Sequence, residues 1–177
     1  PNMPFKGTIM AILISPMIVP LIITSAGMFF FYSKIGLTHT YLGLILAHTA
    51  LGTPFVVITV TATLTGFDTN LIRASQSLGA DTMRTFFKVI MPLILPGVIS
   101  GALFAFITAF DEVVVVMFVG SVEQITIPKQ MWAGLRQETS PVILCMATCL
   151  VALSIALLTT VEMLRRRSER LRGIKQR

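Results

Sequence analysis

Residues 41–66 read YLGLILAHTALGTPFVVITVTATLTG, and this stretch contains no Lys, Arg, Asp or Glu. A helix of roughly 20 apolar residues is long enough to cross the ~30 Å hydrocarbon core of a bilayer. Within lipid the backbone must satisfy its own hydrogen bonds, and a helix does so along its whole length. The stretch therefore predicts a transmembrane helix and sets the fold class of the chain.

Three further apolar stretches are long enough to cross a bilayer. They lie at about residues 8–32, 92–119 and 141–163, and they are too long and continuous for the strands of a barrel. Pro16 and Pro20 are expected to bend the first of them. The predicted fold is all-α: a polytopic membrane helix bundle, with one transmembrane domain over residues 1–177 and four visible spans.

The composition excludes several classes of protein. The chain of 177 residues is 54% hydrophobic and 12% charged, whereas a soluble domain carries about 25% charged residues. This argues against a water-soluble enzyme, a nucleic-acid-binding domain and a disordered tail. The net charge of +6 is concentrated at one end, because seven of the 14 basic residues lie between positions 165 and 177.

The basic residues also predict an orientation in the membrane. Positive residues near span ends favour the cytoplasmic side, so the tail 164–177 is expected to be cytoplasmic and to contact anionic lipid headgroups. Each span crosses to the other side of the membrane, so segments 120–140 and 33–40 are expected outside the cell. Segment 67–91 and the N-terminus are expected in the cytoplasm. Segment 67–91 carries Arg73, Arg84 and Lys88, which agrees.

The segment between the second and third spans, residues 67–91, predicts two short helices joined by a bend. Asp68 is placed to cap the first helix and Asp81 the second. Gly79 is placed to end the first in a left-handed conformation, and Pro92 to open the third span. The apolar face of the first helix is Leu71, Ala74, Ser75 and Leu78. That of the second is Met83, Phe86, Phe87 and Ile90.

The spacing in this segment resembles the coupling loop of permeases from ATP-binding-cassette (ABC) importers. The family motif reads E-A-A-x-x-x-G, then nine residues, then I-x-L-P; here the matching residues are Arg73-Ala74-Ser75, Gly79 and Val89-Ile90-Met91-Pro92. Arg73 reverses the usual charge, whereas Gly79 and Pro92 are kept. The resemblance implies docking on an ATPase through Arg73, Ala74, Ser75, Leu78, Gly79, Ala80 and Pro92. An amphipathic hairpin lying on lipid is the alternative.

Two further segments narrow the resemblance to permeases of the polyamine (spermidine/putrescine) class. They read FDEVVV at residues 110–115 and IPKQMWAGLRQETSP at residues 127–141. The resemblance implies a membrane-spanning subunit in a bacterial inner membrane that forms the translocation path for a small cationic solute. The four stretches correspond to the last four spans of this class, so its first two are expected to be missing.

The same resemblance implies partners. These are ABC ATPase subunits, a second homologous permease, an extracytoplasmic solute-binding protein and membrane lipid, but no nucleic acid. The sequence contains no G-x-x-x-x-G-K-[ST] phosphate-binding loop. ATP is therefore expected to be bound and hydrolysed in a partner chain, and this chain is expected to be a transport subunit with no cofactor of its own.

Three intramembrane residues are candidates for the substrate path. Asp111 and Glu112 are carboxylates within the third apolar stretch, where a charge is costly and usually faces a protein interior or an aqueous path. His48 in the second span is the third. Each is also explained by a structural ion pair or hydrogen bond. No catalytic or metal-ligating set is visible. External contact with a binding protein is expected at Trp132, Arg136 and Glu138, which also fit solvated loop charges and an interfacial anchor.

Other readings of the sequence remain open. The substrate is alternatively an opine or an amino-acid-like compound, and the chain is alternatively a fragment, a short-start form or a remnant that does not transport. An ion channel lacks support because no selectivity motif or pore-lining charge pattern is visible. A membrane enzyme lacks support because only His39 and His48 are present as histidines and no zinc-binding HExxH helix occurs.

Overall fold

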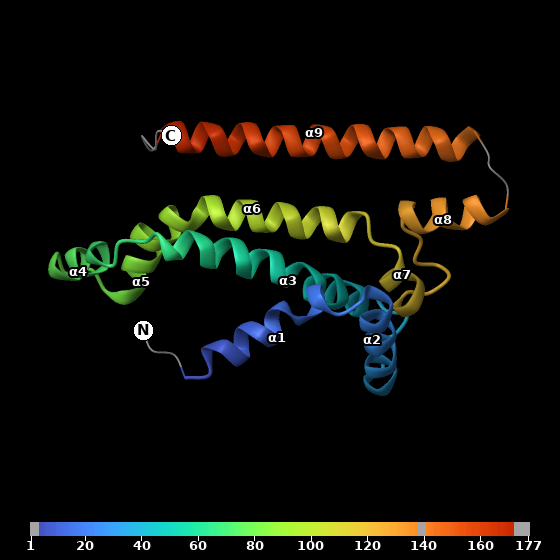
Figure 1. Ribbon diagram of the computed structural model, residues 1–177, viewed down its shortest axis with the longest axis horizontal. Coiled ribbons are helices and arrows are strands. Elements are labelled where there is room, and N and C mark those ends of the chain that lie inside the picture. The colour runs from blue at the N-terminus through green and yellow to red at the C-terminus, as the bar shows by residue number, and fades with distance from the viewer. Residues whose placement is uncertain (1–3, 138–140, 172–177) are drawn as a thin grey trace.

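The computed structural model describes residues 4–137 and 141–171, and every regular element within them is helical (Figure 1). This confirms the predicted all-α fold. The elements are α1 (Lys6–Ile18), α2 (Leu21–Ile35), α3 (Tyr41–Thr65), α4 (Asn70–Ser77), α5 (Thr82–Thr85), the π-helical turn η1 (Phe86–Ile90), α6 (Met91–Phe110), α7 (Val114–Val119), α8 (Ile127–Gln137) and α9 (Pro141–Leu171).

Three helical stretches of the described chain are long and apolar enough to cross a membrane. They are Tyr41–Thr65, Thr82–Phe110 and Pro141–Thr160. The pair α1 and α2 makes a fourth only if both helices are counted as one bent span. Because the expected spans 41–66 and 141–163 each correspond to one helix, the sequence located these two well.

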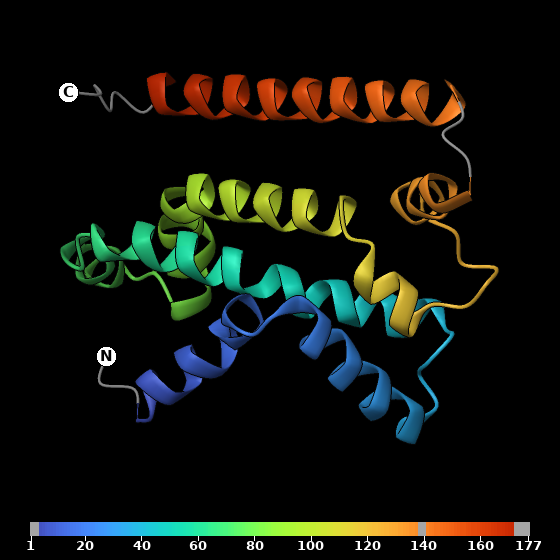
Figure 2. The ribbon, with the colours of Figure 1, turned by 45° about the vertical axis from the view of Figure 1, so that its right-hand side comes forward.

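The first apolar stretch is divided. The axes of α1 and α2 differ in direction by 110° at a break that contains Val19 and Pro20, and the two helices form a V (Figure 2). Proline disfavours helical backbone in the preceding residue, and Val19 is extended at φ −75° and ψ 135°. The predicted bend is therefore present, but the single span expected over residues 8–32 is divided into two helices.

The centre of the molecule is the antiparallel pair α3 and α6, which lie side by side in both views (Figures 1 and 2). Glycines on α6 let the two backbones approach. A Cβ atom on Gly101 would lie 2.7 Å from the Cα of Val56, closer than real Cβ atoms come. A Cβ atom on Gly97 would collide with Thr63. Close contact through small residues is how helices associate in a bilayer, where burial from water supplies little driving force.

The third apolar stretch also differs from the expectation. The second helix of segment 67–91 does not end before Pro92 but continues through η1 into α6. At the other end α6 stops at Phe110, and a break separates it from the short helix α7. The expected span over 92–119 is therefore a helix over Thr82–Phe110 followed by a turn and α7. The physical reason is the side chain of Glu112, which accepts hydrogen bonds from the start of α7.

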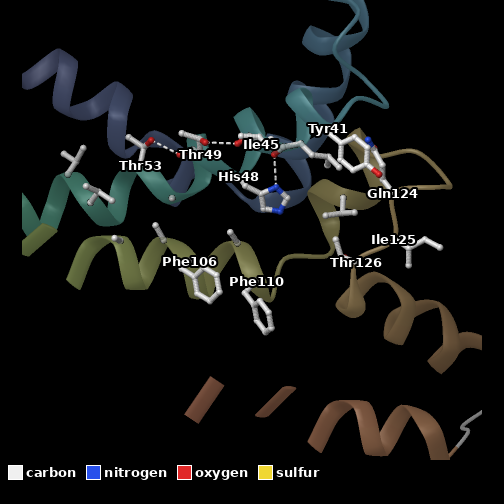
Figure 3. Close-up of a pocket in the computed structure, with 18 of the residues that line it drawn as sticks. Tyr41, Ile45, His48, Thr49, Thr53, Phe106, Phe110, Gln124, Ile125 and Thr126 are labelled. Atoms are coloured by element: carbon white, nitrogen blue, oxygen red, sulfur yellow. Dashed lines mark hydrogen bonds between the residues drawn. The ribbon is translucent and has the colours of Figure 1, made fainter. Parts of the chain in front are cut away.

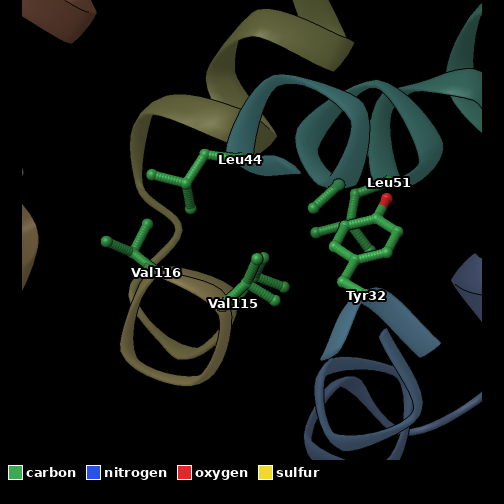
Figure 4. Close-up of a cluster of buried hydrophobic side chains, with 7 residues drawn as sticks. Tyr32, Leu44, Leu51, Val115 and Val116 are labelled. Atoms are coloured by element: carbon green, nitrogen blue, oxygen red, sulfur yellow. The ribbon is translucent and has the colours of Figure 1, made fainter. Parts of the chain in front are cut away.

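A small hydrophobic core holds α7 against α2 and α3 (Figure 4). Its buried members are Tyr32, Leu44, Ala47, Leu51, Val115, Val116 and Val119. Tyr32, near the end of α2, belongs to this core and is only 8% exposed. The core sits at the end of the bundle opposite α4 and α5, so it fixes the residues around the α6–α7 break.

Candidate functional site: the carboxylates after α6 and the α4–α5 hairpin

Glu112 is a buried carboxylate that caps a helix. Its side chain is 6% exposed. Both carboxylate oxygens accept a hydrogen bond from the backbone N–H of Val115, at 2.8 and 2.9 Å, and Oε2 also accepts from Val116 N at 3.3 Å. The first N–H groups of a helix lack partners within the helix and carry partial positive charge. Glu112 therefore satisfies the start of α7, which explains why the chain turns here instead of continuing α6.

His48 on α3 is the ionisable group beside Glu112. Its Nδ1 lies 2.8 Å from the carbonyl oxygen of Leu44. A carbonyl can only accept, so Nδ1 carries the proton. Nε2 then lies toward Glu112 Oε2 at 4.0 Å, too far for a hydrogen bond but close enough for an ion pair when the ring is protonated. The structure thus brings together two of the three candidates for the substrate path.

Asp111, the third candidate, has a different environment from its neighbour. Its backbone N–H donates to Ile107 O at 3.1 Å and ends α6, but its side chain is exposed. Within the described residues that side chain makes no hydrogen bond or ion pair. Asp111 and Glu112 both line a cavity of about 620 Å³, whose other walls are the α1–α2 break (residues 16–21), Leu51 and Phe55 of α3, and Ile107 and Thr108 of α6.

A larger cavity of about 970 Å³ lies along another face of α3 and α6 (Figure 3). His48, Thr49 and Thr53 line it from α3, and Phe106 and Phe110 line it from α6. The loop before α8 lines one end with Glu123 and Gln124. His48 therefore borders this cavity while its partner Glu112 borders the smaller one. This cavity could not be predicted from the sequence, because its lining comes from α3, α6, α7 and the loop before α8.

The loop between α7 and α8 is held by a network that includes Lys129. The ammonium Nζ of Lys129 donates to the carbonyl oxygens of Ser121 at 2.8 Å and Gln124 at 3.1 Å. Gln124 is buried, and its Oε1 accepts from Ser121 N at 2.9 Å. His39 Nδ1 lies 3.0 Å from Gly120 O and ties the loop to the start of α3. The partners of the Lys129 ammonium group are therefore backbone carbonyl groups.

The residues expected to meet an external binding protein are only partly described. Trp132 lies on α8 and is 47% exposed. The side chain of Arg136 and all of Glu138 lie outside the described residues. No group of three or more His, Cys, Asp or Glu side chains that could hold a metal ion occurs in the described residues.

Segment 67–91 projects from the end of the bundle as a hairpin of α4 and α5 (Figure 1). Asp81 caps α5 by accepting from Arg84 N at 2.7 Å, and Gly79 has a positive φ of 81°, both as predicted. Asp68 accepts from Asn70 N at 2.9 Å, so it holds the start of α4 from one position before the cap residue.

One interaction in the hairpin was not foreseen from the sequence. The hydroxyl groups of Ser75 and Thr85 lie 2.9 Å apart and join α4 to α5. Thr85 is 2% exposed, whereas Leu78 is 88% exposed. Of the predicted coupling residues, the structure places Arg73, Ala74, Leu78 and Gly79 on the exposed surface. Ser75 is instead turned toward α5, so it fixes the angle of the hairpin.

Comparisons with known proteins agree with this architecture. The family model for binding-protein-dependent transport system inner membrane components matches residues 1–170. The chain is similar to the spermidine/putrescine transport system permease protein PotC of Haemophilus influenzae, at 29% identity over 92% of this chain and 63% of the relative. It is also similar to PotC of Escherichia coli K12, at 28% identity over 91% of this chain and 61% of the relative.

The putrescine transport system permease protein PotI of Escherichia coli K12 matches at 28% identity over 77% of this chain and 51% of the relative. The chain thus spans 51–63% of the length of these curated relatives. In structure it is similar to a chain of the inward-facing MetNI methionine ABC transporter, with a TM-score of 0.72 at 23% identity over 92% of this chain and 73% of that chain. At this identity the likeness concerns the fold alone. On the match to its family model, the chain belongs to the binding-protein-dependent transport system inner membrane components.

Proposed function

We propose that this chain is a permease subunit that forms part of the translocation path of an ABC importer for spermidine, putrescine or a closely related small polycation. The family match supports the transport class. The names of the PotC and PotI relatives support polyamine as the substrate class. ATP is bound and hydrolysed by a partner chain in this proposal, and this chain contributes the path and the coupling surface.

The single observation that carries the substrate class is Asp111. Its carboxylate is exposed beside a cavity at the end of a long apolar helix, and its side chain has no partner among the described residues. A carboxylate at membrane depth is costly unless it serves a path or a partner. An ammonium group of the substrate supplies that partner. Glu112 contributes differently, because its carboxylate is occupied by the backbone of α7.

The α4–α5 hairpin is the proposed docking element for the ATPase. Leu71 and Leu78 are 42% and 88% exposed, and with the exposed Ala74 they form an apolar face of α4 that no described residue covers. Helices present such a face to a groove on a partner protein. Because Ser75 and Thr85 join α4 to α5, and α5 runs into α6 through η1, movement of the hairpin is transmitted to α6.

The proposed orientation places the hairpin and the C-terminal end of α9 in the cytoplasm. Both lie at the same end of the bundle, and α7 and α8 lie at the other (Figure 1). This arrangement supports the orientation drawn from the basic tail. In this orientation Trp132 lies on the outer side, where an extracytoplasmic binding protein would dock. A second permease would complete the translocation path.

Uptake of labelled putrescine and spermidine tests the proposal. Cells with the gene intact, deleted, and restored with the wild-type chain or with Asp111→Asn are compared at equal membrane levels of the protein. Deletion should abolish uptake and the wild-type chain should restore it. Asp111→Asn should lower uptake by about tenfold or more, because a hydrogen bond to a charged group contributes about 1.5–3 kcal/mol.

Two controls separate the parts of this proposal. Asp111→Glu keeps the charge and should retain more uptake than Asp111→Asn. Labelled amino acids and opines are supplied in parallel, since rescue of their uptake alone would move the substrate to that class. Unchanged polyamine uptake in the deleted strain, in cells with no second polyamine importer, would rule out the proposed function.

A further inference from the structure

The larger cavity has acceptor groups along one wall. Thr49 and Thr53 are one turn apart on α3, and both line the cavity (Figure 3). The Thr49 hydroxyl donates to Ile45 O at 2.7 Å, and the Thr53 hydroxyl donates to Thr49 O at 2.7 Å. Each hydroxyl proton is therefore already used, while the oxygen keeps lone pairs for a ligand. Two such oxygens select a ligand that donates N–H or O–H hydrogen bonds.

The end of the cavity lined by the α7–α8 loop carries a carboxylate. Glu123 lines the cavity, and its side chain makes no hydrogen bond or ion pair within the described residues. The nearby ammonium group of Lys129 donates hydrogen bonds to Ser121 O and Gln124 O. The same network holds the backbone on either side of Glu123. The loop therefore positions a carboxylate at the cavity, while the ammonium group of Lys129 is hydrogen-bonded to backbone carbonyl groups.

The wall formed by α6 is apolar and aromatic. Phe106 and Phe110 line it with their rings stacked at a centroid distance of 5.6 Å and an interplanar angle of 24°. Ala102, Ala105 and Ala109 fill the rest of this wall. Methylene groups gain from contact with such a surface, and the faces of aromatic rings attract cations. A volume of about 970 Å³ is at the upper end of the range for small-molecule sites.

We propose that this cavity is a binding site for a linear alkylammonium ligand, with Thr49 and Thr53 Oγ1 accepting from one ammonium group, Glu123 binding another, and Phe106 and Phe110 covering the methylene chain. The site deepens the proposed function and rests on it for the identity of the ligand as a polyamine. It is distinct from the cavity beside Asp111. The two cavities adjoin at the His48–Glu112 pair, since His48 lines one and Glu112 the other.

Equilibrium binding of radiolabelled putrescine and spermidine to the full chain tests the site. The protein is reconstituted in nanodiscs with the subunits that co-purify. Thr49→Val and Thr53→Val remove the acceptor oxygen at nearly constant shape, and each should raise Kd about fivefold. Glu123→Gln should raise Kd about tenfold. Thr49→Ser keeps the oxygen and should bind like the wild-type chain.

Thr65→Val is the matched control. The Thr65 hydroxyl donates to Thr61 O at 2.8 Å in the same way, but it does not line the cavity. Its variant should bind both ligands with unchanged Kd. Wild-type affinity in Thr49→Val, Thr53→Val and Glu123→Gln would overturn the site, and so would a wild-type protein that binds neither ligand. Thermal unfolding of each variant shows that the comparison is between folded proteins.

Uptake by the same variants distinguishes this site from the proposed function. A chain that binds polyamine through Thr49 and Thr53 but restores no uptake would contradict transport and leave the site standing. A chain whose uptake depends on Asp111, but whose binding is indifferent to Thr49, Thr53 and Glu123, would overturn the site and leave transport standing.

Discussion

Two breaks interrupt the apolar stretches of this protein, and they have different causes. Between α1 and α2 the chain turns at Val19 and Pro20, through a residue that lacks the N–H needed to continue a helix. Between α6 and α7 no proline is present, and the turn is stabilised by the Glu112 carboxylate on the first N–H groups of α7. The first break follows from the presence of a proline. The second depends on the position of the Glu112 side chain, which binds backbone N–H groups of α7.

The largest expected effect is at Glu112. Glu112→Ala leaves N–H groups of Val115 and Val116 without an acceptor in a buried place, so we expect the free energy of unfolding to fall by about 2 kcal/mol. Unfolding in increasing SDS, followed by circular dichroism, measures it. Glu112→Gln keeps one acceptor oxygen and should lose less. Equal stability of Glu112→Ala and the wild-type chain would show that the capping bonds do not hold the α6–α7 break.

The third bend, at Gly79 between α4 and α5, ranks next. Its φ of 81° is a conformation that other residues adopt at a cost of roughly 1–2 kcal/mol, so Gly79→Ala should destabilise the hairpin by about 1 kcal/mol. Because α4 does not belong to the hydrophobic core, we expect limited proteolysis of the hairpin to accelerate while global unfolding changes little. Equal rates of cleavage in Gly79→Ala and the wild-type chain would contradict this.

Pro20→Ala tests how far proline alone makes the first break. We expect the free energy of unfolding to fall by about 0.5 kcal/mol, from the added freedom of the unfolded chain. The bend should persist, because α1 packs on α3 and α2 packs on α7. Spin labels at the outer ends of α1 and α2 report the angle as a distance. A distance matching a straight helix in the variant would show that Pro20 alone imposes the bend.

Asp111 should show the smallest effect on stability, although it adjoins Glu112. Its side chain has no partner among the described residues, so Asp111→Asn should change the free energy of unfolding by less than about 0.5 kcal/mol. The free energies of unfolding of Asp111→Asn and Glu112→Ala are measured in the same SDS titration. Their difference separates a carboxylate that stabilises the fold from one that is available to a ligand. A loss at Asp111 as large as that at Glu112 would remove this distinction.

Much of the fold followed from local pattern. Uncharged length predicted α3 and most of α9, Pro20 predicted a bend, and Gly79 and Asp81 predicted the end of one short helix and the start of the next. These features depend on residues close in sequence. The continuous third span was wrong, because periodicity and hydropathy are the same on both sides of residues 111–113 and do not show a carboxylate turning back to cap α7.

The candidate site was predicted less completely. The sequence singled out His48, Asp111 and Glu112, but it did not show that Glu112 is bound by the backbone of α7 while Asp111 is exposed. The Ser75–Thr85 contact and the binding of Lys129 by carbonyl groups were not predicted, because each joins residues whose distance depends on the path of a turn. The cavity lined by Thr49, Phe110 and Glu123 was not predicted either, because these residues belong to segments far apart in the sequence.

The sequence by itself determined that the chain is a membrane helix bundle and where a hairpin projects from it. Apolar length, charge placement and the backbone limits of Pro and Gly act locally, so they need no knowledge of neighbours. Only the tertiary structure decided which carboxylate is occupied and which is exposed, and which faces of α3 and α6 enclose a cavity. Both features depend on hydrogen bonds and packing between segments far apart in the chain. They cannot be derived from the sequence alone, because the identity of a residue does not determine which residues it contacts.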